Sequence, residues 1–218
     1  MSRTALFERL ARSPSEAVVV TASRRLARDV GWQFDRWQAG QGRRVWETPR
    51  VLPFGAFVAS LHDIAQHDPA LAVARALLAP AQERALWEGV VEAGDVPLAS
   101  PAGAAQLAAE AWSLAHQWRI ADRLRHYVLT EDTRVFARWA ADYERRVERI
   151  GAVDQARLPD VVRALIVAGS VAPPSEVVLA GFDEPTPQQA AFFEALAAGG
   201  TRIERLADDR RPGDCRRV

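Results

Sequence analysis

The chain has 218 residues, of which 49% are hydrophobic, enough for one sizeable core or for one domain with a helical insert. Its 28 basic and 28 acidic residues give a formal net charge of zero, so the surface as a whole is not built for strong affinity to nucleic acid or acidic membranes. Every basic residue is arginine, since the sequence contains neither lysine nor asparagine, and a coding bias explains this most simply. The absence of lysine excludes a phosphate-binding loop of the G-x-x-x-x-G-K-[ST] type, Schiff-base chemistry and lysine-dependent nuclease centres in this chain.

The two ends of the chain and its cysteine content favour a cytoplasmic protein. Met1–Ser13 lacks the apolar core of a secretory signal, and no stretch approaches the ~18 apolar residues of a membrane span. Cys215 is the single cysteine, which excludes an internal disulfide, and with four scattered histidines it offers no recognisable zinc site. We expect neither a cofactor nor a metal. The polar tail Asp208–Val218 is either a frayed end or, as we favour, the point at which a longer protein was cut.

The opening segment predicts a strand followed by a helix. Ala17–Thr21 is a run of β-branched residues suited to a buried strand. Ser23 can cap a helix that ends at Gly40 and Gly42. The apolar positions of this helix share one face and are Leu26, Val30, Phe34 and Trp37.

A second strand and a second helix follow. Arg50–Leu52 predicts the strand, and Pro53 suits the first turn of the helix after it. The apolar positions with helical spacing in this segment are Phe54, Phe57, Val58, Leu61, Ile64 and Ala65. Strand, helix, strand and helix in this order are typical of a parallel α/β sheet.

The middle of the chain predicts helices alone. Pro80–Ala93, Pro101–Ala121 and Thr130–Ile150 are helical stretches with no strand between them. The apolar face of the third is formed by Phe136, Trp139, Ala140, Tyr143, Val147 and Ile150. We therefore expect an all-helical insert.

The last third returns to α/β order. A helix over Asp154–Ala168 precedes a buried strand at Val177–Ala180, which is followed by a helix over Pro187–Ala198 and a strand at Thr201–Leu206. The predicted fold is α/β, with a parallel sheet interrupted by the helical insert and the strands at 17–21 and 177–180 in the same sheet. The predicted parts are 1–75 and 151–218 for the α/β domain, the second of which we expect to be cut short, and 76–150 for the insert.

Two constellations could carry chemistry. Asp183 and Glu184 follow a buried strand, where paired acids hold Mg²⁺ in many nucleotide hydrolases, but a turn or cap explains them equally well. Arg24, Arg25 and Arg28 follow another strand end, where α/β sheets bind ligands and a guanidinium can hold a phosphate. With zero net charge, such a basic stripe requires acids gathered elsewhere. The arginines could instead form a solvated face, or pair with an acid across the sheet.

Seven tryptophans are many for this length. Four of them stand at helix-face spacing and predict core positions, namely Trp37, Trp112, Trp118 and Trp139. Stacking of a nucleic-acid base on an exposed tryptophan is the alternative.

Three stretches of the sequence resemble a known family. The stretches VVTASRRLAR, WETPRVLPFGAF and LAGFDEPTPQQ are similar to the N-terminal region of AddB-like proteins, probable DNA repair proteins related to superfamily 1 helicases of the UvrD/RecB type. The resemblance implies a sheet of helicase (P-loop NTPase-like) type, a PD-(D/E)xK nuclease domain downstream of this chain, contact with single-stranded DNA, and an AddA-like motor subunit as partner. It also implies that Arg24, Arg25 and Arg28 contact DNA, because the segment after this strand lines the DNA track in the family. Thr21 and Ser23 stand at the strand end beside them, where the N-terminus of a helix favours an anion, so we expect these two hydroxyls to join the phosphate contact.

The chain departs from the family at its second ATPase motif. When Pro187 and Gln189 are placed on the family's Pro and Gln, the catalytic Asp-Glu pair falls on Ala180 and Gly181. Asp183 and Glu184 then come three residues too late to act as that pair. The phosphate loop is missing too, since the chain starts almost at the strand that should follow it. The resemblance therefore implies an inactivated helicase fold kept as a scaffold, with no catalytic residue in this chain.

Three functions follow from these observations. The first is a non-catalytic DNA-repair scaffold that contacts single-stranded DNA, a partner motor subunit, or both. The second is a protein-interaction module without DNA contact. The third is an active nucleotide hydrolase that uses Asp183 or Glu184, which the absence of lysine opposes.

Overall fold

The computed structural model describes residues 1–14, 17–67, 75–94, 97–126 and 130–207. Cys215 and the tail from residue 208 onward lie outside the described residues. The chain divides into two compact units. The first contains Met1–Leu61, Ile166–Glu184 and Phe193–Val218, and the second contains His62–Leu165 and Pro185–Phe192. Each unit is described by itself.

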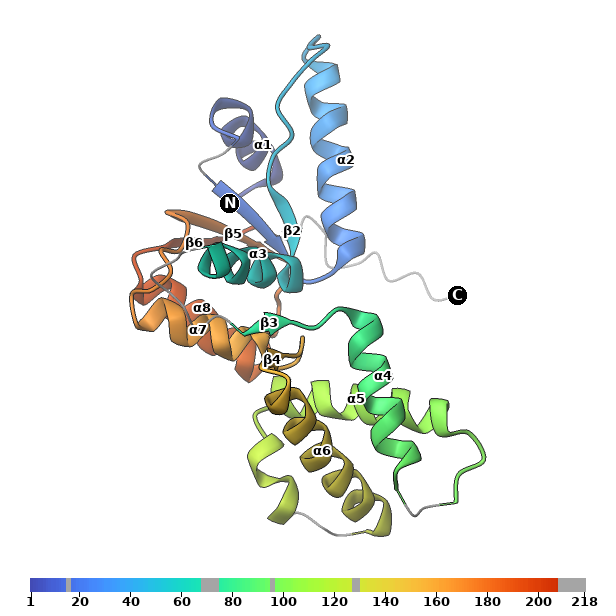
Figure 1. Cartoon of the computed structure of the whole chain (residues 1–218). Coiled ribbons are helices and arrows are strands. Elements are labelled where there is room, and N and C mark those ends of the chain that lie inside the picture. The colour runs from blue at the N-terminus through green and yellow to red at the C-terminus, as the bar shows by residue number, and fades with distance from the viewer. Residues whose placement is uncertain (15–16, 68–74, 95–96, 127–129, 208–218) are drawn as a thin grey trace. The chain divides into compact units, whose positions relative to one another are not determined.

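A parallel sheet organises the first unit (Figure 1). Its four strands have the order β2-β1-β5-β6, with β1 at Ala17–Thr21, β2 at Val51–Pro53, β5 at Glu176–Ala180 and β6 at Arg202–Arg205. β1 pairs with β5 along its whole length, from Ala17 opposite Glu176 to Thr21 opposite Ala180. The prediction of an α/β fold in which these two strands share one parallel sheet is therefore confirmed.

Helices α1 (Arg3–Arg12) and α2 (Arg24–Gly40) cover one face of this sheet. Alternate residues of a strand point to opposite faces, and Val19 of β1 and Val178 of β5 contact this pair of helices. Helix α1 was not predicted, although its buried Leu6, Phe7 and Leu10 lie on one side of a helix capped by the Ser2 hydroxyl. The short apolar pattern is interrupted by charged residues, which hides it until the sheet supplies the surface on which it packs.

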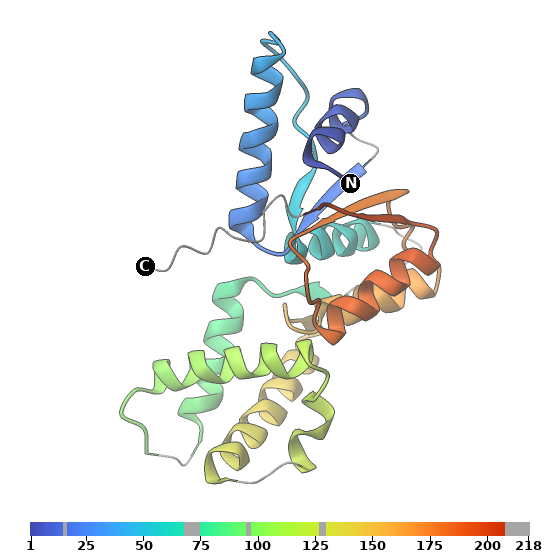
Figure 2. The same ribbon diagram turned by 180° about the vertical axis from the view of Figure 1, so that it is seen from behind.

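Helix α2 begins at the predicted cap and ends at Gly40. Val30 and Phe34 are fully buried, whereas Leu26 and Trp37 are half-buried at the edge of the same core. Figures 1 and 2 show, from opposite sides, α2 extending beyond the sheet, with the connection to β2 returning beside it. The indole Nε1 of Trp46 in this connection donates to the Asp35 carboxylate at 2.7 Å, which ties the connection to the helix.

The second strand and the second predicted helix are shifted slightly. β2 begins and ends one residue later than expected, so that Pro53 is its last residue and α3 (Phe54–His67) starts directly after it. An edge strand can end in proline, because its missing N–H is not needed for pairing. Phe57 and Val58 of α3 are buried as expected, but Ile64 is 54% exposed, so its predicted place on the core face is wrong.

The predicted helices of the insert are present in the second unit. They are α4 (Pro80–Glu92), α5 (Pro101–Gln117) and α6 (Glu131–Arg149), the last with Thr130 as its cap. Their shared core is aromatic, with Trp87 stacked on Tyr143 at a centroid distance of 4.0 Å. Trp112 is buried beside them.

Three expectations for this region are corrected. α5 ends at Gln117, and a short 3₁₀ helix over Ala121–His126 follows it as a separate element. Trp118 and Ile150, both expected in the core, are 57% and 56% exposed. Both residues follow the last turn of their helices, where the backbone leaves the helical path and the periodic face no longer applies.

The remaining elements differ little from expectation. α7 (Leu158–Val167) starts four residues later than predicted, since residues 155–157 form a turn. α8 (Pro187–Ala198) has the predicted bounds. A two-residue strand at Ala76–Leu77, β3, pairs in parallel with β4 at Ala152–Val153. Neither was predicted, because two residues carry no periodic pattern.

Within the described residues, none of the helices combines the length and the apolar content that a membrane span requires.

Candidate functional site

The carboxyl edge of the parallel sheet brings the two sequence-predicted regions together. Thr21, the last residue of β1, is level with Pro53 on one side and with Ala180 on the other. The N–H of Ala22 donates to the Ala180 carbonyl at 3.0 Å, which extends the pairing past the ends of both strands. The segments that carry Arg24 and Gly181 therefore start from neighbouring points of one edge, where α/β sheets place their ligands.

The two hydroxyls at this edge have structural roles. The Thr21 side chain is fully buried, and its Oγ1 donates to the Ser23 carbonyl at 2.9 Å. The Oγ of Ser23 accepts from the Leu26 N–H at 3.2 Å and caps α2. In this conformation Thr21 does not face solvent, so a phosphate at this edge would meet the arginines of the first helical turns instead.

Arg24, Arg25 and Arg28 are all exposed. No residue that the structure describes forms an ion pair with any of them. The arginine that does pair across the sheet is Arg9 of α1, which contacts Glu176 of β5 and, at 3.4 Å, Glu204 of β6. The alternative that the three arginines of α2 only hold the fold through an ion pair is thus without support in the described residues.

The position where the resemblance aligns a catalytic acid is built from small residues. Ala180 is buried at the end of β5, and Gly181 follows it with a φ of +75°. A Cβ on Gly181 would lie 2.6 Å from the Cδ2 of Leu26 in α2. Side chains other than glycine are strained at this φ, and a carboxylate here would also displace Leu26.

Asp183 and Glu184 lie in the irregular connection between β5 and α8 and are exposed. Neither side chain contacts another described residue in a hydrogen bond or an ion pair. The cap of α8 is made further on, where Gln189 accepts from the Thr186 N–H at 3.0 Å and Thr186 accepts from the Gln189 N–H. Gln189 therefore has a structural role. Within the described residues, no group of three or more His, Cys, Asp or Glu side chains is placed to hold a metal ion.

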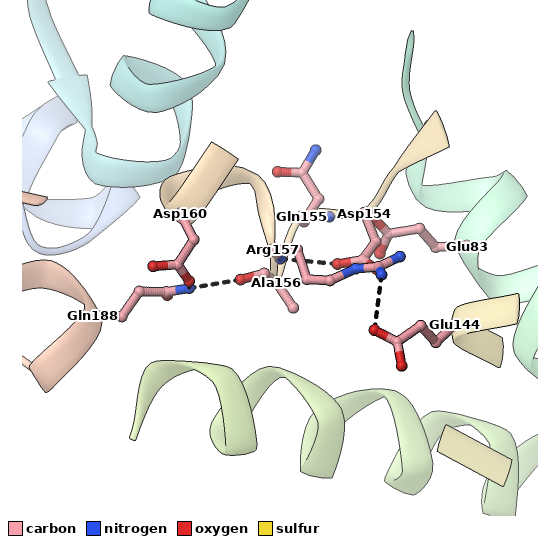
Figure 3. A network of polar contacts seen from close by, with 8 residues as sticks. All are labelled: Glu83, Glu144, Asp154, Gln155, Ala156, Arg157, Asp160 and Gln188. Carbon is pink, nitrogen blue, oxygen red and sulfur yellow. Dashed lines mark hydrogen bonds and ion pairs between the residues drawn. The ribbon is translucent and has the colours of Figure 1, made fainter. Parts of the chain in front are cut away.

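A polar network lies inside the helical unit (Figure 3). Asp154 is 1% exposed, and its carboxylate accepts from the Arg157 N–H at 2.9 Å and from the Arg157 Nε at 2.8 Å. The guanidinium of Arg157 also donates to Glu144 of α6 at 3.3 Å. Glu83 of α4 accepts from the Gln155 N–H at 2.6 Å. The network joins α4 and α6 to the turn before α7, so its geometry is that of a structural brace.

Gln188 of α8 extends this network. Its side-chain nitrogen donates to the Ala156 carbonyl and to the Asp160 carboxylate, both at 2.8 Å, as Figure 3 shows.

Burial in the helical unit raises the pKa of the Glu83 carboxyl and that of the Tyr143 hydroxyl, and it lowers the pKa of His116. The lowered pKa favours the neutral imidazole of His116 at pH 7. Among the residues drawn in Figure 3, Arg157 is the cation.

Two features near the candidate site were not predicted from the sequence. Trp32 is 56% exposed on α2, and the Arg36 guanidinium lies over its ring at 4.7 Å from the centroid. Arg205, at the end of β6, donates to the Phe182 carbonyl at 3.4 Å. Both could have been predicted from the sequence. Trp32 lies off the apolar face of its predicted helix, and Arg205 lies near the end of a predicted strand.

Neither a family model nor a curated protein matches this sequence.

Proposed function

We propose that this chain is a non-catalytic, helicase-like scaffold of a DNA-repair helicase–nuclease, and that it contacts single-stranded DNA through the first turns of α2. An AddA-like motor subunit is the proposed protein partner. The parallel sheet supports the proposal, because three neighbouring strands, β2, β1 and β5, overlap the three stretches on which the resemblance to AddB-like proteins rests.

The proposed DNA contact rests on the exposure of three arginines and on their lack of ion-pair partners among the described residues. Arg24, Arg25 and Arg28 are exposed at the carboxyl edge of the sheet, and no described residue neutralises them by an ion pair. The first turn of a helix adds N–H groups and a dipole that favour anions. Guanidinium groups bind phosphate without selecting a base, as a sequence-independent repair factor requires.

Replacing Arg24, Arg25 and Arg28 with glutamine is expected to weaken binding to a single-stranded oligothymidylate. Each lost phosphate contact reduces the slope of log K against log salt by about 0.7 for single strands, so the triple variant should lose about 2 from its slope. Fluorescence anisotropy over a salt series measures both the affinity and the slope.

The matched control carries the same loss of charge elsewhere. Arg134, Arg138 and Arg149 are exposed on α6, and their triple replacement by glutamine should leave the salt slope unchanged. Equal slopes for the parent and the α2 variant, with equal thermal stability, would place the DNA contact elsewhere or exclude it.

We also expect no ATP turnover by this chain. It has no lysine to hold the β- and γ-phosphates, and small residues, Ala180 and Gly181, stand where the resemblance aligns the acids that bind Mg²⁺. A coupled phosphate-release assay with Mg-ATP and single-stranded DNA should give the rate of the buffer alone. DNA-stimulated turnover that Asp183→Ala abolishes would show that the exposed acids act as a catalytic pair after all.

A protein-interaction module is the second candidate, and one surface favours it. Leu107 and Leu114 of α5 are 68% and 53% exposed. Their spacing of seven residues puts them on one side of the helix, where a partner helix could pack. Binding of a partner subunit that the double variant Leu107→Ser and Leu114→Ser abolishes, together with no measurable DNA binding by the parent, would favour this function over the first.

A further inference from the structure

The outward face of α2 carries a row of exposed side chains beyond the helix start. Arg25, Arg28, Trp32 and Arg36 are spaced three or four residues apart, so they follow one side of the helix. At a rise of 1.5 Å per residue, the row is about 16 Å long. This side is opposite to the buried Val30 and Phe34, which leaves the row facing solvent.

An aromatic ring stands within this basic row. Trp32 is 56% exposed, although a tryptophan in a helix usually buries most of its surface. The guanidinium of Arg36 lies 4.7 Å from the ring centroid, and this cation–π contact fixes the ring orientation while more than half of the residue stays open to solvent. Ordered, exposed aromatic rings beside arginine are the surfaces on which proteins stack unpaired bases.

The segment 22–44, which contains α2 and the loop after it, carries a net positive charge in a chain whose total net charge is zero. Residues 22–44 contain six arginines against two aspartates, an excess of four positive charges that the rest of the chain balances. Both aspartates are engaged by neutral donors, Asp29 by the Gln33 amide at 2.9 Å and Asp35 by the Trp46 indole at 2.7 Å. On α2 itself the excess is two positive charges, and Arg43 and Arg44 in the loop that follows the helix supply the other two.

We propose that single-stranded DNA follows this face of α2, with a base stacked on Trp32 and phosphates held by Arg25 and Arg28 on one side and by Arg36 on the other. The inference rests on the proposed DNA contact and adds its path and its base-binding residue.

Comparing an oligothymidylate with an abasic strand of the same length tests the stacking step. Both strands carry the same phosphates, but only the first carries bases. Trp32→Ala should weaken binding of the oligothymidylate by roughly 5- to 150-fold and leave binding of the abasic strand unchanged. Trp32→Phe should restore part of the loss, since it keeps an aromatic face.

Trp118→Ala is the matched control, because Trp118 is exposed to the same extent in the other unit and should not affect either strand. If Trp32→Ala leaves the oligothymidylate affinity unchanged while the α2 arginine variant weakens it, the stacking inference is wrong and the proposed DNA contact stands. If the parent binds neither strand at low salt, both are wrong. A partner protein that binds Trp32 while DNA does not would assign the same row to a protein interface.

Discussion

Replacing Arg157 with methionine is expected to lower the free energy of unfolding by about 3–5 kcal/mol. The Asp154 carboxylate is 1% exposed and receives both the N–H and the Nε of Arg157. Removing the guanidinium leaves a buried carboxylate with one backbone donor, and the desolvation of that charge is no longer offset. Methionine keeps much of the side-chain volume, so the loss reports on the charge and its hydrogen bonds. Urea denaturation followed by circular dichroism measures it.

Arg145→Met provides the comparison. Arg145 pairs with Asp142 at 3.2 Å on the surface of α6, where its side chain is 63% exposed. Exposed pairs of this kind contribute about 0–1 kcal/mol, because water solvates both partners when the pair is broken. Similar losses for the two variants would mean that the Asp154–Arg157 pair is solvated in solution and does not brace the helical unit.

Trp87→Ala should also lower the free energy of unfolding by about 3–5 kcal/mol. Trp87 is 1% exposed, stacks on Tyr143 with an interplanar angle of 10° and meets Trp112 edge-on at 6.3 Å. Deleting the indole removes apolar burial and leaves a cavity between α4, α5 and α6 that neighbouring rings fill poorly. The same denaturation experiment, with the folded baseline read from near-ultraviolet circular dichroism, measures the loss.

Trp118→Ala removes the same side chain from an exposed position in the same unit. Its effect should stay within about 0.5 kcal/mol, as for most surface substitutions. A loss for Trp87→Ala no larger than that for Trp118→Ala would contradict the packing of the helical core around Trp87.

Most of the secondary structure is specified by local sequence patterns. Five β-branched or small residues in a row specify β1, and apolar residues at helical spacing with a serine or threonine cap specify α2 and α6. These signals are local, so they need no partner to be recognised. The sequence also determined chemistry that is independent of fold, since a chain without lysine cannot offer an ammonium to a nucleotide.

Elements with weak local sequence patterns could be recognised only in the tertiary structure. α1 has an interrupted apolar face and gains its burial from the sheet and α2. β3 and β4 have two residues each and form only because they meet. The predicted helix faces also failed at Ile64, Trp118 and Ile150, near or beyond the last turns, where periodicity no longer reports which side faces the core.

At the candidate site, too, some properties are specified by the sequence and others are decided by the fold. That Arg24, Arg25 and Arg28 follow a strand end is a property of the sequence, but their exposure and their lack of an ion pair with any described residue are properties of the fold. Thr21 was predicted beside them as a surface hydroxyl, and the register of β1 between β2 and β5 buries it instead. Non-local pairing decides burial, and a linear pattern contains no information on which strands become neighbours. For the same reason the contact of Gly181 with Leu26, and with it the lack of room for a carboxylate beside α2, appeared only when β5 was placed next to β1.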